Sequence, residues 1–128
     1  MNESVYFESE IPWEKVEILL GLGNEYGFDP LSSIESEKFF KDLISKYNIK
    51  EIDFLDLLRK DIEKLFKVID KKPEWIQDPE WQFNNGKPME FIGQLDIKKN
   101  KIGLHDDVAF YVFWDRDVGK MKTIMQIG

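Results

Sequence analysis

The chain has one histidine, and two carboxylates follow it directly in the segment His105-Asp106-Asp107. An imidazole beside an acid could serve as a general base, and the three side chains could contribute to a divalent-metal site. However, neighbouring residues of an extended chain point in opposite directions, and a metal site draws its ligands from several elements. The segment is also typical of a polar loop that leads into a β-hairpin. We favour the loop and predict neither a metal site nor a cofactor.

Gln94 is a second polar residue of interest because it stands inside an apolar segment. The alternation over residues 89–97 predicts a strand, with Gln94 on the face opposite to Met89, Phe91, Leu95 and Ile97. Its amide would then be either a recognition group or part of a half-exposed sheet. Gly93 predicts a β-bulge or a close approach of another backbone. Gln94, His105 and Asp107 together form the candidate site for a small ligand or an enzymatic reaction.

Two tryptophans and several acids lie close together in the proline-containing stretch that starts at residue 73. Aromatic side chains are enriched at binding hot spots, and acidic neighbours attract a cationic protein. Trp75, Asp78, Glu80 and Trp81 are therefore the candidate partner-binding residues. The structural alternative is that both rings hold an extended segment against the sheet or the third helix.

The motifs that are absent exclude several classes of enzyme. The sequence has no P-loop, no dinucleotide fingerprint, no G-x-S-x-G and no H-E-x-x-H. It has no cysteine, which excludes disulfides, thiolate–metal sites and a cysteine nucleophile. A hydrolase that uses a pair of carboxylates stays open, because the chain has 25 acidic residues and none of them is distinguished by its position.

Charge favours a protein partner over nucleic acid or membrane. The formal net charge is −7, and both halves are acidic: residues 1–72 have 11 basic and 16 acidic residues, and residues 73–128 have 7 and 9. Such a chain repels phosphate backbones and anionic lipid, but it suits a basic protein. We see no signal peptide, and the longest apolar run, Val108–Trp114, is too short to span a membrane. We therefore expect a cytoplasmic protein.

Residues 1–72 predict three helices. Pro12 would open the first, and Gly21, Gly23 and Gly27 would end it. A capping box of Ser32 with Glu35 would open the second. Asp53 would cap the third, which would run on to a stop at Pro73.

From residue 73 onward the hydrophobic period changes from about 3.6 residues to two. A turn is predicted at Asn84-Asn85-Gly86, followed by the strand over residues 89–97. Val108–Trp114 is apolar on both faces and should be the central strand. The last strand would be Lys120–Ile127. At 128 residues the chain fits one α+β domain, with three N-terminal helices (1–72) packed on an antiparallel meander of at least three strands (73–128).

Part of the second half resembles a known family. The residues are Trp81, Gly86-Lys87-Pro88-Met89, Phe91-Ile92-Gly93-Gln94-Leu95-Asp96 and Phe110-Tyr111-Val112-Phe113-Trp114-Asp115. They resemble the YwqG-like family of uncharacterised bacterial proteins over about residues 73–126. Members of that family are usually longer and have further strands. The resemblance implies a bacterial origin and a β-rich C-terminal half, and it carries over no activity.

Two functions of different classes follow from these features. The first is a small acidic protein-binding module, of the kind represented by bacterial immunity proteins that neutralise a toxin by covering a basic active site. The alternative is a low-turnover enzyme or small-ligand binder with its site near Gln94, His105 and Asp107. The two differ in whether these three side chains converge on one pocket.

Overall fold

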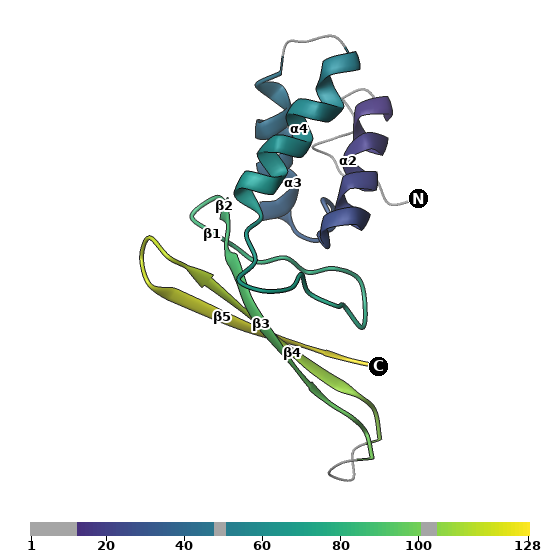
Figure 1. Ribbon diagram of the computed structural model, residues 1–128, viewed down its shortest axis with the longest axis vertical. Coiled ribbons are helices and arrows are strands. Elements are labelled where there is room, and N and C mark those ends of the chain that lie inside the picture. Colours follow the sequence, from purple (N-terminus) through teal and green to yellow (C-terminus); the bar gives the residue numbers. More distant parts are fainter. Residues whose placement is uncertain (1–12, 48–50, 101–104) are drawn as a thin grey trace.

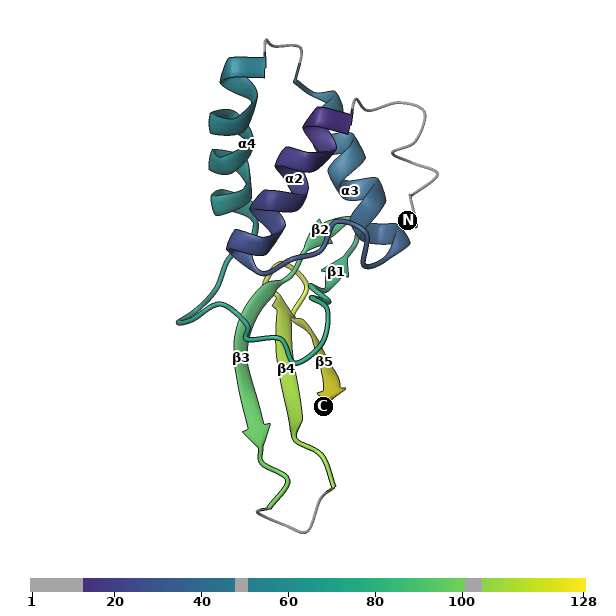
Figure 2. The same cartoon turned by 90° about the vertical axis from the view of Figure 1, so that its right-hand side faces the viewer.

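The computed structural model describes residues 13–47, 51–100 and 105–128, and within them it shows the expected α+β architecture. Three helices come first: α2 (Trp13–Tyr26), α3 (Ile34–Ser45) and α4 (Glu51–Leu65). A short hairpin follows, formed by β1 (Phe83–Asn84) and β2 (Lys87–Pro88). The main sheet is antiparallel, with β4 (Val108–Asp115) between β3 (Glu90–Ile97) and β5 (Lys120–Ile127). The helices lie beyond one end of this sheet (Figures 1 and 2).

Helix α2 continues through two of the three glycines that we expected to end it. Gly21 and Gly23 lie inside the helix, and only Gly27, with φ at +88°, follows its last residue. The Gly27 and Phe28 amides donate to the Gly23 carbonyl at 2.8 and 3.0 Å. A Cβ on Gly23 would lie 2.5 Å from the Phe28 carbonyl oxygen, so the returning chain requires glycine there. The predicted first residue, Pro12, lies outside the described residues.

The other two helices differ from prediction at their ends. Helix α3 is capped by Ser33 rather than Ser32, and the Ser33 hydroxyl accepts from the Ser36 amide at 3.0 Å. Helix α4 begins at Glu51, so Asp53 is inside it and not its cap. It also ends at Leu65, well before Pro73.

The early end of α4 has a physical reason: the backbone after it is hydrogen-bonded to the sheet. The Phe91 amide donates to the Lys67 carbonyl at 2.9 Å, and the Ile69 amide donates to the Phe91 carbonyl at 3.0 Å. Residues 67–69 therefore pair with β3 at a single residue, on the edge of β3 that faces away from β4. This pairing satisfies the backbone groups that would otherwise have continued the helix.

A single aromatic cluster joins the helices to the sheet. Phe28 stacks on Phe40 and on Phe66, with ring centroids 4.9 and 4.6 Å apart. Phe66 meets Trp81 edge-on at 5.2 Å, and Trp81 meets Phe113 of β4 at 5.5 Å. All five rings are at least 94% buried. The helical half and the β half of the chain therefore share one continuous hydrophobic core.

The two faces of the β3–β4–β5 sheet have different surroundings. We call the face that holds Phe91, Tyr111 and Phe113 the inner face; the segment of residues 66–83 packs on it (Figure 2). The opposite face is the outer face. A β-bulge between Phe91 and Gly93 shifts the register. As a result Gln94 pairs with Tyr111 and lies on the inner face, while Leu95 lies on the outer face. The predicted bulge is confirmed, and Leu95 lies opposite to Gln94 as predicted, but the predicted placement of Phe91 on the same face as Leu95 and opposite to Gln94 is wrong.

Candidate functional site

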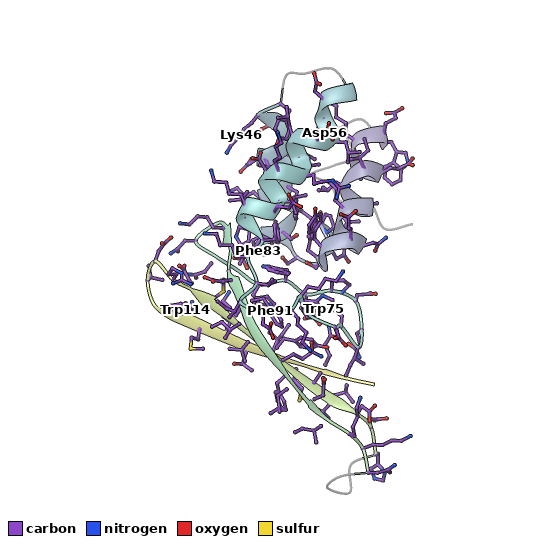
Figure 3. All side chains as sticks on the ribbon, viewed as in Figure 1. Lys46, Asp56, Trp75, Phe83, Phe91 and Trp114 are labelled. Carbon is purple, nitrogen blue, oxygen red and sulfur yellow. The ribbon has the colours of Figure 1, made fainter. Side chains whose placement is uncertain are left out.

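The two tryptophans proposed for partner binding pack within the fold instead. Trp81 is 2% exposed, and its indole N–H donates to the Met89 carbonyl at 2.9 Å. Trp75 stacks on Tyr111 with centroids 4.5 Å apart, and its indole N–H donates to the Gly27 carbonyl at 2.7 Å. The Trp75 ring thus lies between β4 and the residue that follows α2 (Figure 3). The geometry matches the structural alternative, because Trp81 has no exposed ring for a partner to contact.

The acids of the same segment are fixed by one buried residue of β5. Gln126 is 1% exposed, and its side-chain amide donates to the Asp78 carbonyl at 2.8 Å and to the Glu80 carboxylate at 3.0 Å. Its oxygen accepts from the Gln77 amide at 2.8 Å. Asp78 remains exposed on this segment, over the inner face. Glu80 is partly buried there, so the two acids no longer flank an accessible aromatic patch.

Tyr111 and Gln94 fix the beginning of the same segment. The Tyr111 hydroxyl accepts from the Ile76 amide and donates to the Glu74 carbonyl, both at 3.0 Å, and burial raises the Tyr111 pKa. The Gln94 side chain binds the Glu74 backbone twice: its oxygen accepts at 2.8 Å and its nitrogen donates at 2.9 Å. That nitrogen also donates to Asp96 at 2.8 Å. The amide of Gln94 is therefore engaged in holding the chain in place.

The structure brings Gln94 and Asp107, but not His105, to one open hollow. This hollow has a volume of about 320 Å³ and is lined by both residues together with Trp75, Asp96 and Lys98 among others. His105 is exposed and is not among the lining residues. One Asp107 oxygen accepts from the Lys99 amide at 2.9 Å, as a residue that closes a turn does. Within the described ranges, no three His, Cys, Asp or Glu side chains are grouped so that they could hold a metal ion.

The most distinctive surface is the outer face, which is not among the sites predicted from the sequence. Cross-strand pairing places its residues in rows such as Leu95–Phe110–Met125 and Ile97–Val108–Ile127. Four of its side chains are strongly exposed: Leu95 at 60%, Met121 at 58%, Met125 at 52% and Ile127 at 41%. In all, nine apolar residues form it: Leu95, Ile97, Val108, Phe110, Val112, Trp114, Met121, Met125 and Ile127.

Within the described strands, charged side chains reach the outer face at the end where β3 begins and β4 ends. There Glu90 pairs with Trp114, and Arg116 binds the Glu90 carboxylate through both of its oxygens, at 2.9 and 3.1 Å. The Arg116 guanidinium also lies over the Trp114 ring, 4.8 Å from its centroid. Figure 3 shows Trp114 near the β4–β5 turn, well apart from Trp75. Thr123, in the middle of β5, is the one polar side chain within the apolar rows.

A signal for this surface was present in the sequence. Met121, Thr123, Met125 and Ile127 alternate with other residues along the sequence, which is usual for one face of an edge strand. Val108–Trp114 is apolar on both sides, so its sheet needs two covering layers. The segment of residues 66–83 provides one of them, on the inner face (Figure 2). The second apolar side of the central strand was therefore the clue.

No family model, curated protein or solved structure matches this chain. The YwqG-like resemblance of residues 73–126 accordingly stays a prediction from sequence. In the part of the chain that the structure describes, none of the helices has the length and apolar character needed to cross a bilayer.

Proposed function

We propose that the protein is an acidic, cytoplasmic protein-binding module that holds its partner on the outer face of the sheet. The observation that carries this proposal is the exposure of the apolar rows of β3, β4 and β5 to solvent. Burying apolar surface is favourable by roughly 25 cal/mol per Å². A large apolar patch on a soluble domain is typical of an interaction site. We assign partner binding to this face and not to Trp75 and Trp81, because the two indoles make contacts within the fold.

The partner's chemistry follows from charge. The outer face is nearly uncharged, whereas the chain has a net charge of −7, most of it on residues 1–72. A protein with an apolar patch beside a basic surface fits both features, because opposite charges speed encounter and apolar contact provides affinity. Neutralisation of a toxin by covering its basic active site is the function that we propose for this pairing.

A catalytic role at Gln94, His105 and Asp107 has less support. The Gln94 amide is held by Glu74 and Asp96, and His105 does not line the hollow that Gln94 and Asp107 share. Replacing His105 with alanine should abolish an activity at that site, and it should leave partner binding unchanged.

The experiment is a calorimetric binding measurement with the product of the neighbouring gene. Leu95→Gln and Met125→Gln keep side-chain size and net charge while they remove apolar contact from opposite sides of Phe110. Each buried Leu or Met contributes about 1.5–3 kcal/mol, so the double variant should lose roughly a hundredfold or more in affinity. Ile34→Gln is the matched control, because Ile34 is 68% exposed and belongs to α3, not to the outer face of the sheet.

Unchanged affinity in the double variant would remove the outer face from the proposal. A wild-type protein that fails to bind, or that does not protect cells producing the neighbouring protein, would exclude that protein as the partner. Association should also slow steeply as salt is added, because the long-range attraction is screened. An association rate that is independent of salt would contradict the basic partner.

A further inference from the structure

Among the described residues, no strand pairs with the edge of β5 that faces away from β4, and the alternation of hydrogen bonds identifies the residues that form this edge. Asp107 and Gly128 exchange both of their backbone hydrogen bonds at 3.0 Å, so Gly128 directs its N–H and C=O toward β4. In an antiparallel ladder the direction of these groups alternates along the strand. Ile127, Met125, Thr123 and Met121 therefore direct their backbone groups away from β4. Their side chains lie on the outer face.

The opposite edge of the sheet, on β3, is partly paired and partly charged. At Phe91 the outward backbone groups are bound by Lys67 and Ile69. The charged side chain of Asp96 lies farther along the same strand, and charges at an edge discourage further pairing. On β5, residues 121, 123 and 125 carry no charge. The Ile127 carbonyl already accepts from the Gln77 side chain at 2.8 Å, which limits the open edge to Met121–Met125.

We infer that this edge pairs with the same edge of a second copy, antiparallel and about a two-fold axis at Thr123. In this register Met121 lies opposite Met125 of the second copy, and the two Thr123 residues lie opposite each other. All three positions direct their backbone groups outward, so each can form a doubly hydrogen-bonded pair. The product is a six-stranded sheet in which both outer faces point the same way.

Charge selects this register. With the axis at Thr123, Lys120 lies opposite Gln126 and Lys122 lies opposite Ile124, so no two like charges are paired. An axis at Lys122 would place two lysines directly opposite each other, which is destabilising. An axis at Ile124 would use the Ile127 carbonyl, which Gln77 already occupies. Opposed threonines are a favourable cross-strand pair.

The absence of cysteine permits a direct test by cross-linking. In a hydrogen-bonded antiparallel pair the Cα atoms are about 5.5 Å apart, which is within disulfide range. Under mild oxidation Thr123→Cys should form a covalent dimer, and a reductant should reverse it. Ile34→Cys also occupies an exposed position, lies on α3, and should cross-link only slowly. Equal rates for the two variants would overturn the inference.

Charge exchange provides a second test that does not depend on oxidation. Thr123→Lys and Thr123→Glu each place like charges on the axis, and sedimentation should show association weakened about tenfold or more. Mixing the two variants should restore the dimer, whereas Ile34→Lys should dimerise like the wild type. A wild-type chain that is monomeric at every concentration, or a mixture that stays monomeric, would overturn the second-copy assignment. A monomer that binds a foreign strand at this edge would overturn it as well.

One variant separates the proposal for the outer face from the proposal for the β5 edge. Leu95 lies on β3, away from the free edge, so Leu95→Gln should weaken partner binding and leave the dimer intact. Thr123→Lys should weaken the dimer. Leu95→Gln therefore tests the outer face without touching the dimer, whereas Thr123→Lys, whose side chain also lies on the outer face, tests the dimer through sedimentation alone.

Discussion

The two faces of one sheet show how burial and hydrophobicity can separate. The inner face contains polar groups, among them the Tyr111 hydroxyl, Gln94 and Gln126, yet Tyr111 and Gln126 are almost completely buried. The outer face is nearly all apolar, yet Leu95, Met121 and Met125 are each more than half exposed. Tyr111 and Gln126 can be buried, and Gln94 half-buried, because each is hydrogen-bonded to the segment that crosses that face.

This difference separates two tasks. Specific hydrogen bonds fix one segment of this chain on the inner face, which suits a permanent contact. The outer face offers shape and apolar area without directed polar groups, which suits a contact made with another molecule. The more hydrophobic side of the sheet is therefore the one that we assign to binding.

Truncating one ring on each face should give the largest contrast. Phe113 is fully buried among Trp81, Trp75 and Phe91, so Phe113→Ala should lower the free energy of unfolding by about 3–5 kcal/mol. Leu95→Ala on the outer face should change it by about 0.5 kcal/mol or less. Urea denaturation at low protein concentration measures both. Similar losses for the two variants would mean that the outer face is covered within the chain.

Removing a single hydroxyl should show how strongly the inner polar groups act. Tyr111→Phe keeps the ring but leaves the Ile76 amide without its acceptor, which should cost about 1–3 kcal/mol. Thr123→Val removes a hydroxyl from the outer face and should be close to neutral. The same denaturation measurement applies. A neutral Tyr111→Phe would show that the hydroxyl does not hold the segment.

Asp115, at the end of β4, makes the comparison dependent on pH. The Asn84 side chain donates to its carboxylate at 2.7 Å and is the largest cause of a pKa below the ordinary value of 3.8. A lowered pKa in the folded state stabilises the fold above the unfolded value, and this contribution is lost as pH falls through the folded pKa. Asn84→Ala should therefore move the Asp115 midpoint upward, as followed by carbon NMR of its carboxyl group. An unchanged midpoint would exclude Asn84 as the cause.

The double variant of the outer face should show the smallest change in stability but a clear change in dye fluorescence. Leu95→Gln with Met125→Gln should leave the unfolding midpoint nearly unchanged, because both side chains are more than half exposed. Binding of a dye that fluoresces on apolar surfaces should fall relative to the wild type. Ile34→Gln should have little effect on the dye, because Ile34 lies on α3 and is not part of the outer face. Equal dye binding by all three proteins would show that the outer face is not the main apolar surface.

Much of the architecture could be predicted from periodicity. The change of period near Pro73 separated helices from strands correctly, and Val108–Trp114 was correctly placed at the centre of the sheet. Errors arose where tertiary contacts outweighed local signals. Gly23 stays helical because the Phe28 backbone packs against it, and α4 ends early because Lys67 and Ile69 bind Phe91.

The candidate site was harder to predict because one extra residue in β3 changes the face of the sheet on which the following side chains lie. The bulge at Ile92 moves Leu95 to the outside and Gln94 to the inside, and a strict period of two cannot represent that shift. Trp81 was selected because tryptophan is common in interfaces, but aromatic residues are equally suited to a core. Residue type alone could not distinguish these roles. Their burial does.

The hydrogen bond from Trp75 to Gly27 joins three parts of the chain that are distant in sequence. The indole ring rests on β4, its nitrogen holds the residue that ends α2, and its own backbone belongs to the crossing segment. Helices and sheet should consequently melt together, since neither can separate without exposing this ring. A chain in which Trp75 is the only indole would carry its own optical reporter: its emission would shift to the red in the same transition in which helical circular dichroism disappears.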